Sequence, residues 1–135
     1  MTLAAAGPLV ALIDRDEPAH GRCADVLQHL SEPLLTTWAA FSEAMYLVGA
    51  AGRWPAQAAL WRLWARGDLQ IIPPDPEETA RAAELTEQYA DLPMDLADAT
   101  LVAAAESRRL TRVFTLDAHF RAYRPKGIGS FNILP

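Results

Sequence analysis

The chain has 135 residues, of which 51% are hydrophobic and 21% are charged, and its formal net charge is −5. This composition excludes a disordered segment and predicts one folded domain over residues 1–135. The negative charge argues against binding of nucleic acid through overall positive charge, but it leaves room for an enzyme that acts on nucleic acid at a local site. No apolar run reaches the roughly 20 residues that cross a bilayer. A single cysteine, Cys23, makes no internal disulfide, so we expect a cytoplasmic protein.

Charged residues are unevenly distributed in the second half of the chain. Residues 75–98 hold eight acids and one base, whereas residues 108–126 hold six Lys or Arg and one acid. The simplest interpretation of each stretch is a solvated helix or loop.

Apolar runs alternate with amphipathic stretches along the chain. Short apolar runs predict strands at residues 8–13, 34–37, 69–72, 112–115 and 131–134. Helical spacing of apolar residues predicts helices at residues 18–30, 38–48, 55–66, 76–89 and 95–108. Strands that alternate with helices predict an α/β fold with a parallel sheet and right-handed crossovers.

Two carboxylates are expected at the carboxyl edge of this sheet. Asp14 directly follows the first predicted strand, and Asp117 comes two residues after the fourth. Ligands of open parallel sheets bind at this edge, near the point where the strand order reverses. If the first and fourth strands are neighbours across that reversal, the two carboxylates converge. Asp117 also has a structural interpretation, as the cap of a short helix at residues 118–121.

Three further acids are candidates for the same site. Asp95 and Asp98 lie three residues apart at the start of a helix, where the first can be the N-cap and the second can favour the helix dipole. Glu43 is the sole charge in the apolar segment 38–48. A glutamate in such a segment is buried and paired, or else exposed on the outer face of the helix.

The joint pattern points to a metal site. Several carboxylates brought close together repel one another, and a divalent cation removes that penalty. Carboxylate oxygens suit Mg²⁺ or Mn²⁺, which support attack on a phosphodiester. The chain has no Gly-rich phosphate loop, no GxSxG motif and no HExxH motif.

The order of these motifs resembles a known family. A first strand followed by Asp14, a helix with Glu43, the segment Met94–Ala99 and the segment Phe114–Asp117 follow one another as they do in PIN-domain ribonucleases, specifically the VapC-type toxins of bacterial toxin–antitoxin pairs. The resemblance covers residues 8–132. It implies a three-layer α/β/α fold with a central five-stranded parallel sheet. It also implies a Mg²⁺- or Mn²⁺-dependent endoribonuclease that leaves a 5′-phosphate and a 3′-hydroxyl.

The resemblance also implies roles for individual residues. The acidic quartet would be Asp14, Glu43, Asp98 and Asp117, with Thr115 beside the last acid. Asp14, Asp98 and Asp117 would hold the ion, with Asp95 as an additional ligand. Glu43 would orient or deprotonate the attacking water, and the basic segment after Arg108 would guide the RNA backbone. Replacing Asp14 or Asp98 by Asn is then expected to abolish cleavage.

Two positions depart from the family pattern. Asp16 stands where the family often has Ser or Thr, and it adds a possible ligand. His119 stands where the family often has a second acid, which puts a second metal ion in doubt. We interpret His119 as a surface residue on a short helix, with contact to the scissile phosphate as the alternative.

By resemblance, the partners are an RNA substrate and a small antitoxin that covers the site, and the toxin is a homodimer. No membrane partner is expected. Segment 38–48 and the tryptophans Trp54, Trp61 and Trp64 offer surfaces for such contacts. For Trp61 and Trp64, the competing interpretation is that they belong to the core.

Two other functions remain open from the sequence. A phosphatase of the haloacid dehalogenase type would use Asp14 of the Asp14-Arg15-Asp16 motif as its nucleophile, but the only lysine is Lys126. A non-catalytic module of the same fold would use its acidic pocket to hold a basic protein. Metal titration separates the module from the nuclease.

Overall fold

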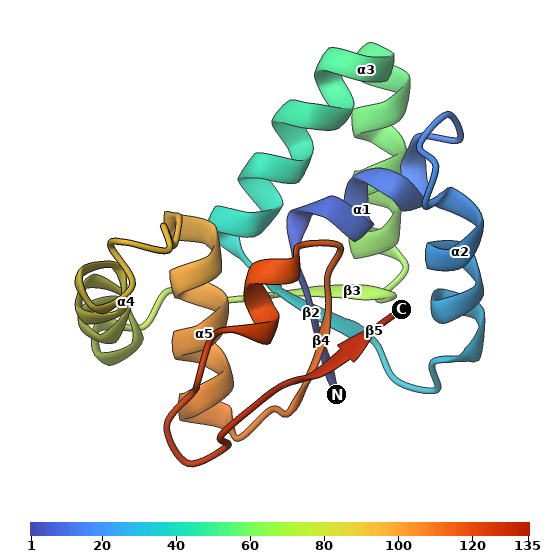
Figure 1. Ribbon diagram of the computed structural model, residues 1–135. Helices are drawn as coiled ribbons and strands as arrows, with labels where there is room; N and C mark the ends of the chain where they lie inside the picture. Colours follow the sequence, from blue (N-terminus) through green and yellow to red (C-terminus); the bar gives the residue numbers. More distant parts are fainter.

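Five parallel strands form the centre of the structure, a computed structural model that describes residues 1–135 (Figure 1). The strands are β1 (Thr2–Ala4), β2 (Leu34–Thr37), β3 (Leu69–Ile72), β4 (Arg112–Phe114) and β5 (Asn132–Leu134). The helices are α1 (Ala6–Ile13), α2 (His20–His29), α3 (Trp38–Ala65), α4 (Pro76–Gln88), α5 (Leu96–Arg108) and the short 3₁₀ helix η1 (Ala118–Arg121).

The strand order is β3-β2-β1-β4-β5, and every neighbouring pair is parallel. The chain first builds the sheet outward from β1 to β3 and then crosses back to add β4 on the other side of β1. The order therefore reverses between β1 and β4, which is the arrangement on which the expected convergence of carboxylates depends. Their carboxyl ends are held side by side, because Ala4 pairs with Phe114 and the Ala5 amide donates to the Phe114 carbonyl at 2.9 Å.

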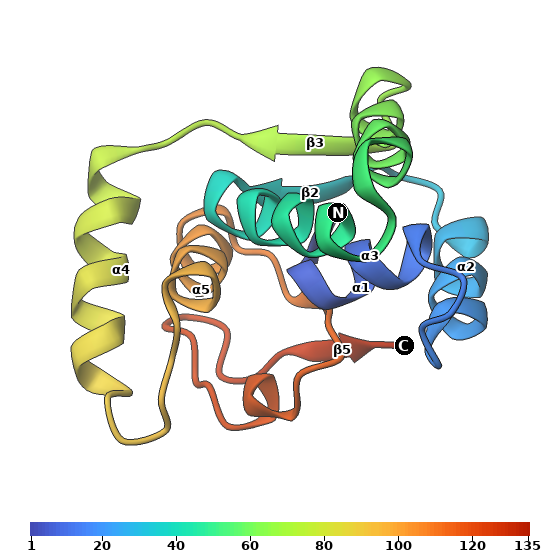
Figure 2. The same cartoon turned by 90° about the horizontal axis from the view of Figure 1, so that it is seen from above.

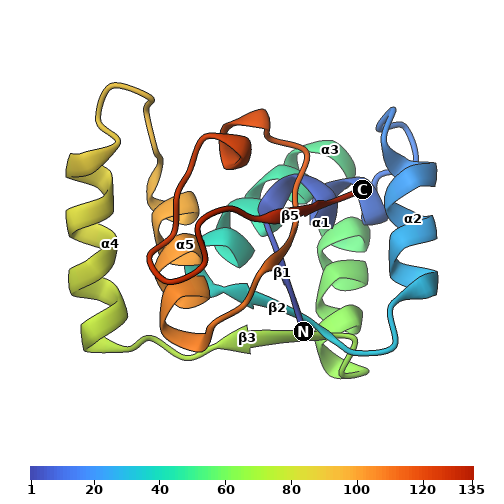
Figure 3. The ribbon, with the colours of Figure 1, turned by 60° about the horizontal axis from the view of Figure 1, so that its bottom comes forward.

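Helices cover both faces of the sheet, which confirms the three-layer α/β/α arrangement. Alternate side chains of a strand point to opposite faces. Leu3 and Val113 face α5, and α4 packs against the outer side of that helix. Ala4 and Phe114 face the layer formed by α1, α2 and α3. Figure 3 shows the two helical layers on opposite sides of the strands. Each fully buried Leu or Phe in these clusters contributes about 1.5–3 kcal/mol.

The predicted strand at residues 8–13 is wrong, because these residues belong to α1. The first strand is Thr2–Ala4, which is fully buried between β2 and β4. Pro8 lies in the first turn of α1, where its missing N–H breaks no helical hydrogen bond. The run from Leu9 to Ile13 is apolar on all sides because α2, α3 and the sheet surround the helix. A short buried helix of this kind has the same apolar pattern as a buried strand.

The two helices predicted at residues 38–48 and 55–66 are the two arms of α3. The chain reverses at Arg53, whose φ of 57° and ψ of −153° break the helical geometry. Figures 1 and 2 show the arms running side by side in opposite directions. The Gln57 side-chain amide donates to the Met45 carbonyl at 3.4 Å and ties them together. No helix, α3 included, has the length and apolar character needed to cross a membrane.

The two tryptophans with a competing core interpretation differ. Trp61 is half-buried and packs edge-on against Phe41, with 5.0 Å between ring centroids. Trp64 is 51% exposed, so the core interpretation holds for Trp61 and not for Trp64.

Candidate active site

A pocket lies at the carboxyl ends of β1 and β4, where the strand order reverses. Four carboxylates from three separate parts of the chain line it: Glu43 of α3, Asp95 and Asp98 at the start of α5, and Asp117 after β4. The pocket is also lined by Thr115 and by the backbone that joins β1 to α1. We call it the carboxylate pocket. The fold thus brings together four of the proposed acids and leaves out Asp14 and the possible ligand Asp16.

The expectation that Asp14 shares this pocket is wrong. Asp14 caps the carboxyl end of α1, and its Oδ1 accepts a 3.0 Å hydrogen bond from the Asp16 amide. The pocket contacts the opposite end of α1, at Ala6 and Gly7. The eight residues of α1 rise about 1.5 Å each, which separates the two ends by about 12 Å. Asp14 does not follow a strand either, so the phosphatase interpretation loses its basis.

The residue that directly follows β1 is Ala5, and it lines the carboxylate pocket. Ala5 is 6% exposed and is the N-cap residue of α1, where no side chain caps the helix. From the sequence, we expect a carboxylate directly after the first strand. The structure therefore has one acid fewer at this position than expected.

Asp98 is the most buried acid of the pocket, at 8% exposure. Its backbone amide donates to Asp95 Oδ1 at 2.8 Å, so Asp95 caps α5 and faces the pocket at the same time. Burial raises the pKa of Asp98 to about 7, and the negative charge of Asp95 adds to this effect. A hydrogen bond of 2.9 Å from Tyr123 Oη to Asp98 Oδ2 acts in the opposite direction and favours the carboxylate.

Sequence reasoning missed Tyr123, which is fully buried. Its ring packs between Tyr89 and Phe120, with centroid distances of 5.2 Å and 5.1 Å. Burial and the bond to Asp98 raise the pKa of Tyr123, so its hydroxyl is a permanent donor. A tyrosine 25 residues after its partner in the sequence carries no local signal for such a contact.

Glu43 lies on the surface of α3 and faces the carboxylate pocket. Partial burial of its carboxyl raises its pKa, and the charges of Asp95 and Asp117 raise it further. Glu43 is exposed, which is one of the two alternatives from the sequence, and it also lines the pocket. A glutamate with a raised pKa beside other acids is a candidate for a general base.

Thr115 fixes the turn that carries Asp117. Its Oγ1 accepts a 3.1 Å hydrogen bond from the Asp117 amide. Asp117 Oδ1 in turn accepts from the His119 amide at 2.9 Å, so this acid caps η1, as the structural interpretation predicts. The His119 ring is exposed on that helix and lies 3.4 Å from Asp117 Oδ1. Asp16 is exposed at the far end of α1 and does not line the pocket.

The donor set suits a hard cation in its chemistry. Mg²⁺ keeps several waters and is often held by one or two carboxylates together with substrate phosphates. Burial raises the pKa of Asp98 most, and the charges of Asp95, Asp117 and Glu43 raise it further, so a bound cation would stabilise the ionised carboxylate against both effects. No group of three or more acidic, histidine or cysteine side chains lies close enough together to hold an ion. The residues present therefore fit an ion held by at most two carboxylates at once.

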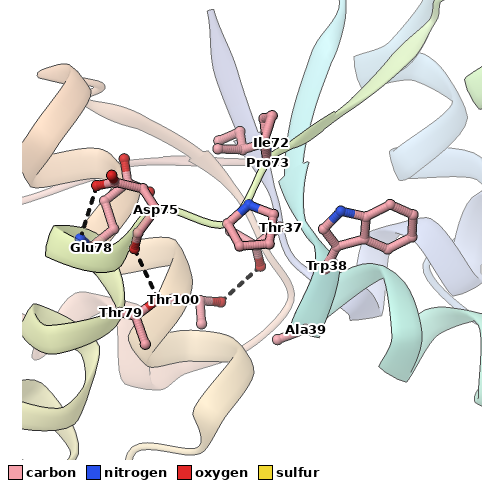
Figure 4. A pocket seen from close by; sticks show the side chains of 10 residues that line it. Thr37, Trp38, Ala39, Ile72, Pro73, Asp75, Glu78, Thr79 and Thr100 are labelled. Atoms are coloured by element: carbon pink, nitrogen blue, oxygen red, sulfur yellow. Dashed lines mark hydrogen bonds between the residues drawn. The ribbon is translucent and has the colours of Figure 1, made fainter.

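A second pocket lies beyond the carboxyl ends of β2 and β3 (Figure 4). Its polar groups already have partners. Thr37 and Thr100 share a 2.7 Å hydrogen bond, and Asp75 caps α4 by accepting from the Glu78 amide at 3.0 Å. The first bond joins the end of β2 to α5, and the second lies within the first turn of α4. We therefore assign the chemistry to the carboxylate pocket.

Part of the basic segment at residues 108–126 is engaged in contacts within the protein. Arg108 pairs with Glu78 at 3.3 Å, and the Arg124 guanidinium donates to the carbonyls of Arg121 and Tyr123. The Arg121 guanidinium forms no ion pair, and it lines a cleft that also contains Thr115 and Asp117. Of the expected guiding residues, Arg121 is the one that the fold brings beside the carboxylates.

Together, the fold and the pocket define a class of α/β/α domains that place carboxylates at the switch point of a five-stranded parallel sheet. A family model described as PIN domain matches residues 6–125 of the chain. This protein belongs to the PIN domain family.

Three relatives illustrate the similarity. Ribonuclease VapC26 of Mycobacterium tuberculosis is 30% identical over 128 residues, which cover 94% of this chain and 95% of that protein. The crystal structure of VapC20 from the same species, a toxin that cleaves the sarcin–ricin loop, has a TM-score of 0.83 at 16% identity, with coverage of 90% and 94%. FitAcB from Neisseria gonorrhoeae has a TM-score of 0.66 at 17% identity, with coverage of 98% and 97%. The two solved structures support the fold.

Proposed function

We infer that this protein is a metal-dependent endoribonuclease that hydrolyses RNA phosphodiester bonds as the toxin of a type II toxin–antitoxin pair. The observation that carries this proposal is the carboxylate pocket at the switch point, in a chain 30% identical to a VapC ribonuclease over nearly its whole length. Its acids suit Mg²⁺ or Mn²⁺. Such an ion neutralises charge at phosphorus, which favours hydrolysis of the phosphodiester bonds of a nucleic acid.

Each residue of the pocket has a role in this proposal. Asp98 and Asp117 would hold the ion directly, and Asp95, at the cap of α5, would reach it only through a water. A bound ion neutralises charge on the phosphoryl group and acidifies a water. Glu43 orients the attacking water and accepts its proton.

Two further residues position the acids in this mechanism. The Thr115 hydroxyl accepts a hydrogen bond from the Asp117 amide, and the Tyr123 hydroxyl donates one to the Asp98 carboxylate. Asp14 has no part, because it lies at the far end of α1.

The test is cleavage of RNA by purified protein freed of any antitoxin. Incubation with total RNA in Mg²⁺ or Mn²⁺ is expected to give discrete fragments with 5′-phosphate and 3′-hydroxyl ends, and EDTA is expected to stop the reaction. Asp98→Asn is the matched inactive control, because Asn keeps the shape and the acceptor for Tyr123. Fragments that form equally with Asp98→Asn would come from a contaminating nuclease. No cleavage and no Mn²⁺ binding would favour the module that holds a basic protein.

We also propose a small antitoxin as the protein partner and a homodimer as the assembly. Relatives of the same fold were solved as complexes, such as VapBC2 of Rickettsia felis, with a TM-score of 0.72 at 12% identity. Exposed apolar side chains near the bend of α3, such as Tyr46 at 76% and Trp54 at 65% exposure, offer surface for these contacts. Co-expression with the protein encoded beside this one, followed by size-exclusion chromatography, tests both points.

A further inference from the structure

A cleft adjoins the carboxylate pocket, on the other side of the segment from Thr115 to Asp117. These three residues line both cavities, so one continuous surface runs from the acids into the cleft. The cleft has a volume of about 370 Å³, within the range of small-molecule sites. Its walls come from the start of α2, from η1 and from the chain end after β5. Figures 1 and 3 show the C-terminus beside α2.

Two arginines line this cleft. Arg22 lies in the first turn of α2, and Arg121 lies at the end of η1. Both are exposed, and neither guanidinium forms an ion pair in the structure. Two carboxylates, Glu17 and Asp117, line the same cleft, and neither forms an ion pair with these arginines. Two guanidinium groups without partners, in a chain of net charge −5, are free to bind an external anion.

We propose that Arg22 and Arg121 form a subsite for a backbone phosphate of the RNA, one that flanks the scissile phosphate held at the carboxylates. This assignment rests on the proposed nuclease function. Guanidinium groups bind phosphate oxygens in a two-pronged geometry that a single point charge does not provide. Leu116 is exposed and lines both cavities. An RNA strand that occupies both cavities would therefore cross this apolar side chain between its two bound phosphates.

The subsite also answers an electrostatic difficulty of the carboxylate pocket. Its acids repel RNA, and the chain as a whole is negative. The positive charges of the two arginines offset that repulsion close to the acids. Exposed charges act over about one Debye length, roughly 10 Å at 0.1 M salt. RNA binding is therefore expected to depend on these arginines even in the absence of metal.

The experiment measures binding of a fluorescein-labelled single-stranded RNA oligonucleotide in EDTA, by fluorescence anisotropy at several salt concentrations. Arg22→Ala and Arg121→Ala are each expected to weaken binding about three- to tenfold, and the double variant more than either. The slope of log K against log salt is expected to fall by about 0.7 for each phosphate that the variant no longer binds. Arg62→Ala is the matched control, because Arg62 is exposed on α3 and lines neither cavity. Glu17→Gln is expected to tighten binding, since it removes a negative charge from the cleft.

Wild-type affinity and salt slope in the double variant would overturn the subsite. Circular dichroism and thermal melting verify that each variant is folded, and Arg121→Lys, which keeps the charge, is expected to retain part of the salt dependence. The cleavage assay separates this proposal from the nuclease assignment. RNA cleavage with an unchanged KM in the double variant would contradict the subsite and leave the nuclease assignment standing. Arginine-dependent RNA binding without any cleavage would contradict the nuclease assignment and support the subsite.

Discussion

Tyr123 Oη donates a 2.9 Å hydrogen bond to Asp98 Oδ2 at the bottom of the carboxylate pocket. The two residues are 0% and 8% exposed. Burial and neighbouring acids favour the protonated form of Asp98, whereas this bond favours the ionised form. The tyrosine therefore keeps the carboxylate within the range in which it ionises near neutral pH, where a cation can bind to it.

Asp98→Asn is expected to stabilise the protein at neutral pH and to abolish cleavage. The folded-state pKa of about 7 lies above the unfolded value of about 3.9, so the protonated carboxyl favours folding. This contribution is complete below about pH 4 and is lost as the pH rises through 7. Asn does not titrate, so the variant should exceed the wild type by roughly 1–3 kcal/mol at pH 8 and converge with it in acid. Urea unfolding at pH 4.5, 6 and 8 measures the difference; a constant gap across these pH values would contradict it.

Tyr123→Phe is expected to shift the pH dependence of cleavage upward. Removal of the hydroxyl takes away the group that stabilises the ionised Asp98, so a higher pH is needed to ionise the carboxyl. The absence of this buried hydrogen bond costs about 1 kcal/mol of stability. Tyr89→Phe is the matched control, because the Tyr89 ring packs on Tyr123 but its hydroxyl accepts from the Arg124 amide. Rate–pH profiles of the two variants that move together would assign the effect to packing.

Ala5→Asp is expected to strengthen metal binding. This residue lines a pocket that already holds four carboxylates, and an added carboxylate would complete a larger oxygen donor set. Ala5→Asn is the control, since both Asp and Asn can cap α1 but only Asp adds charge. Calorimetric titration with Mn²⁺ is expected to show about tenfold tighter binding for the Asp variant. Without metal, the Asp variant should melt below the Asn variant because its charge is repelled.

Glu43→Gln and Asp14→Asn are expected to have opposite outcomes. Glu43 faces the pocket, and removal of a general base typically costs a factor of about 10²–10⁴ in rate. Asp14 lies at the other end of α1, so its variant should retain cleavage within about threefold of the wild type, as is common for changes distant from the chemistry. Initial rates on one labelled RNA, with melting temperatures as the fold control, compare them directly. Loss of cleavage in Asp14→Asn would return this acid to the mechanism.

Much of the fold could be predicted because its signals are local. The apolar runs at residues 34–37 and 69–72 are strands with these bounds, and the prolines and glycines around them mark real ends. Asp75 and Asp95 are helix caps, which the spacing of a polar residue before an apolar helix indicates. The approach of Asp98 and Asp117 was also predictable, because Asp98 lies in the first turn of α5, Asp117 follows β4, and ligand sites of parallel sheets lie at this edge. The place of Glu43, within α3, was expected only from the family resemblance.

The sequence by itself determined the alternation of strands and helices and the presence of Asp117 at the carboxyl edge of the sheet. Only the tertiary structure decided that β1 is the three-residue strand Thr2–Ala4, that the run up to Ile13 is a helix, and that Ala5 rather than Asp14 lines the pocket. A fully buried apolar run has no polar face from which its period can be read, so its partners choose between helix and strand. The same holds for Tyr123 and Arg22, whose places depend on contacts between segments far apart in the chain.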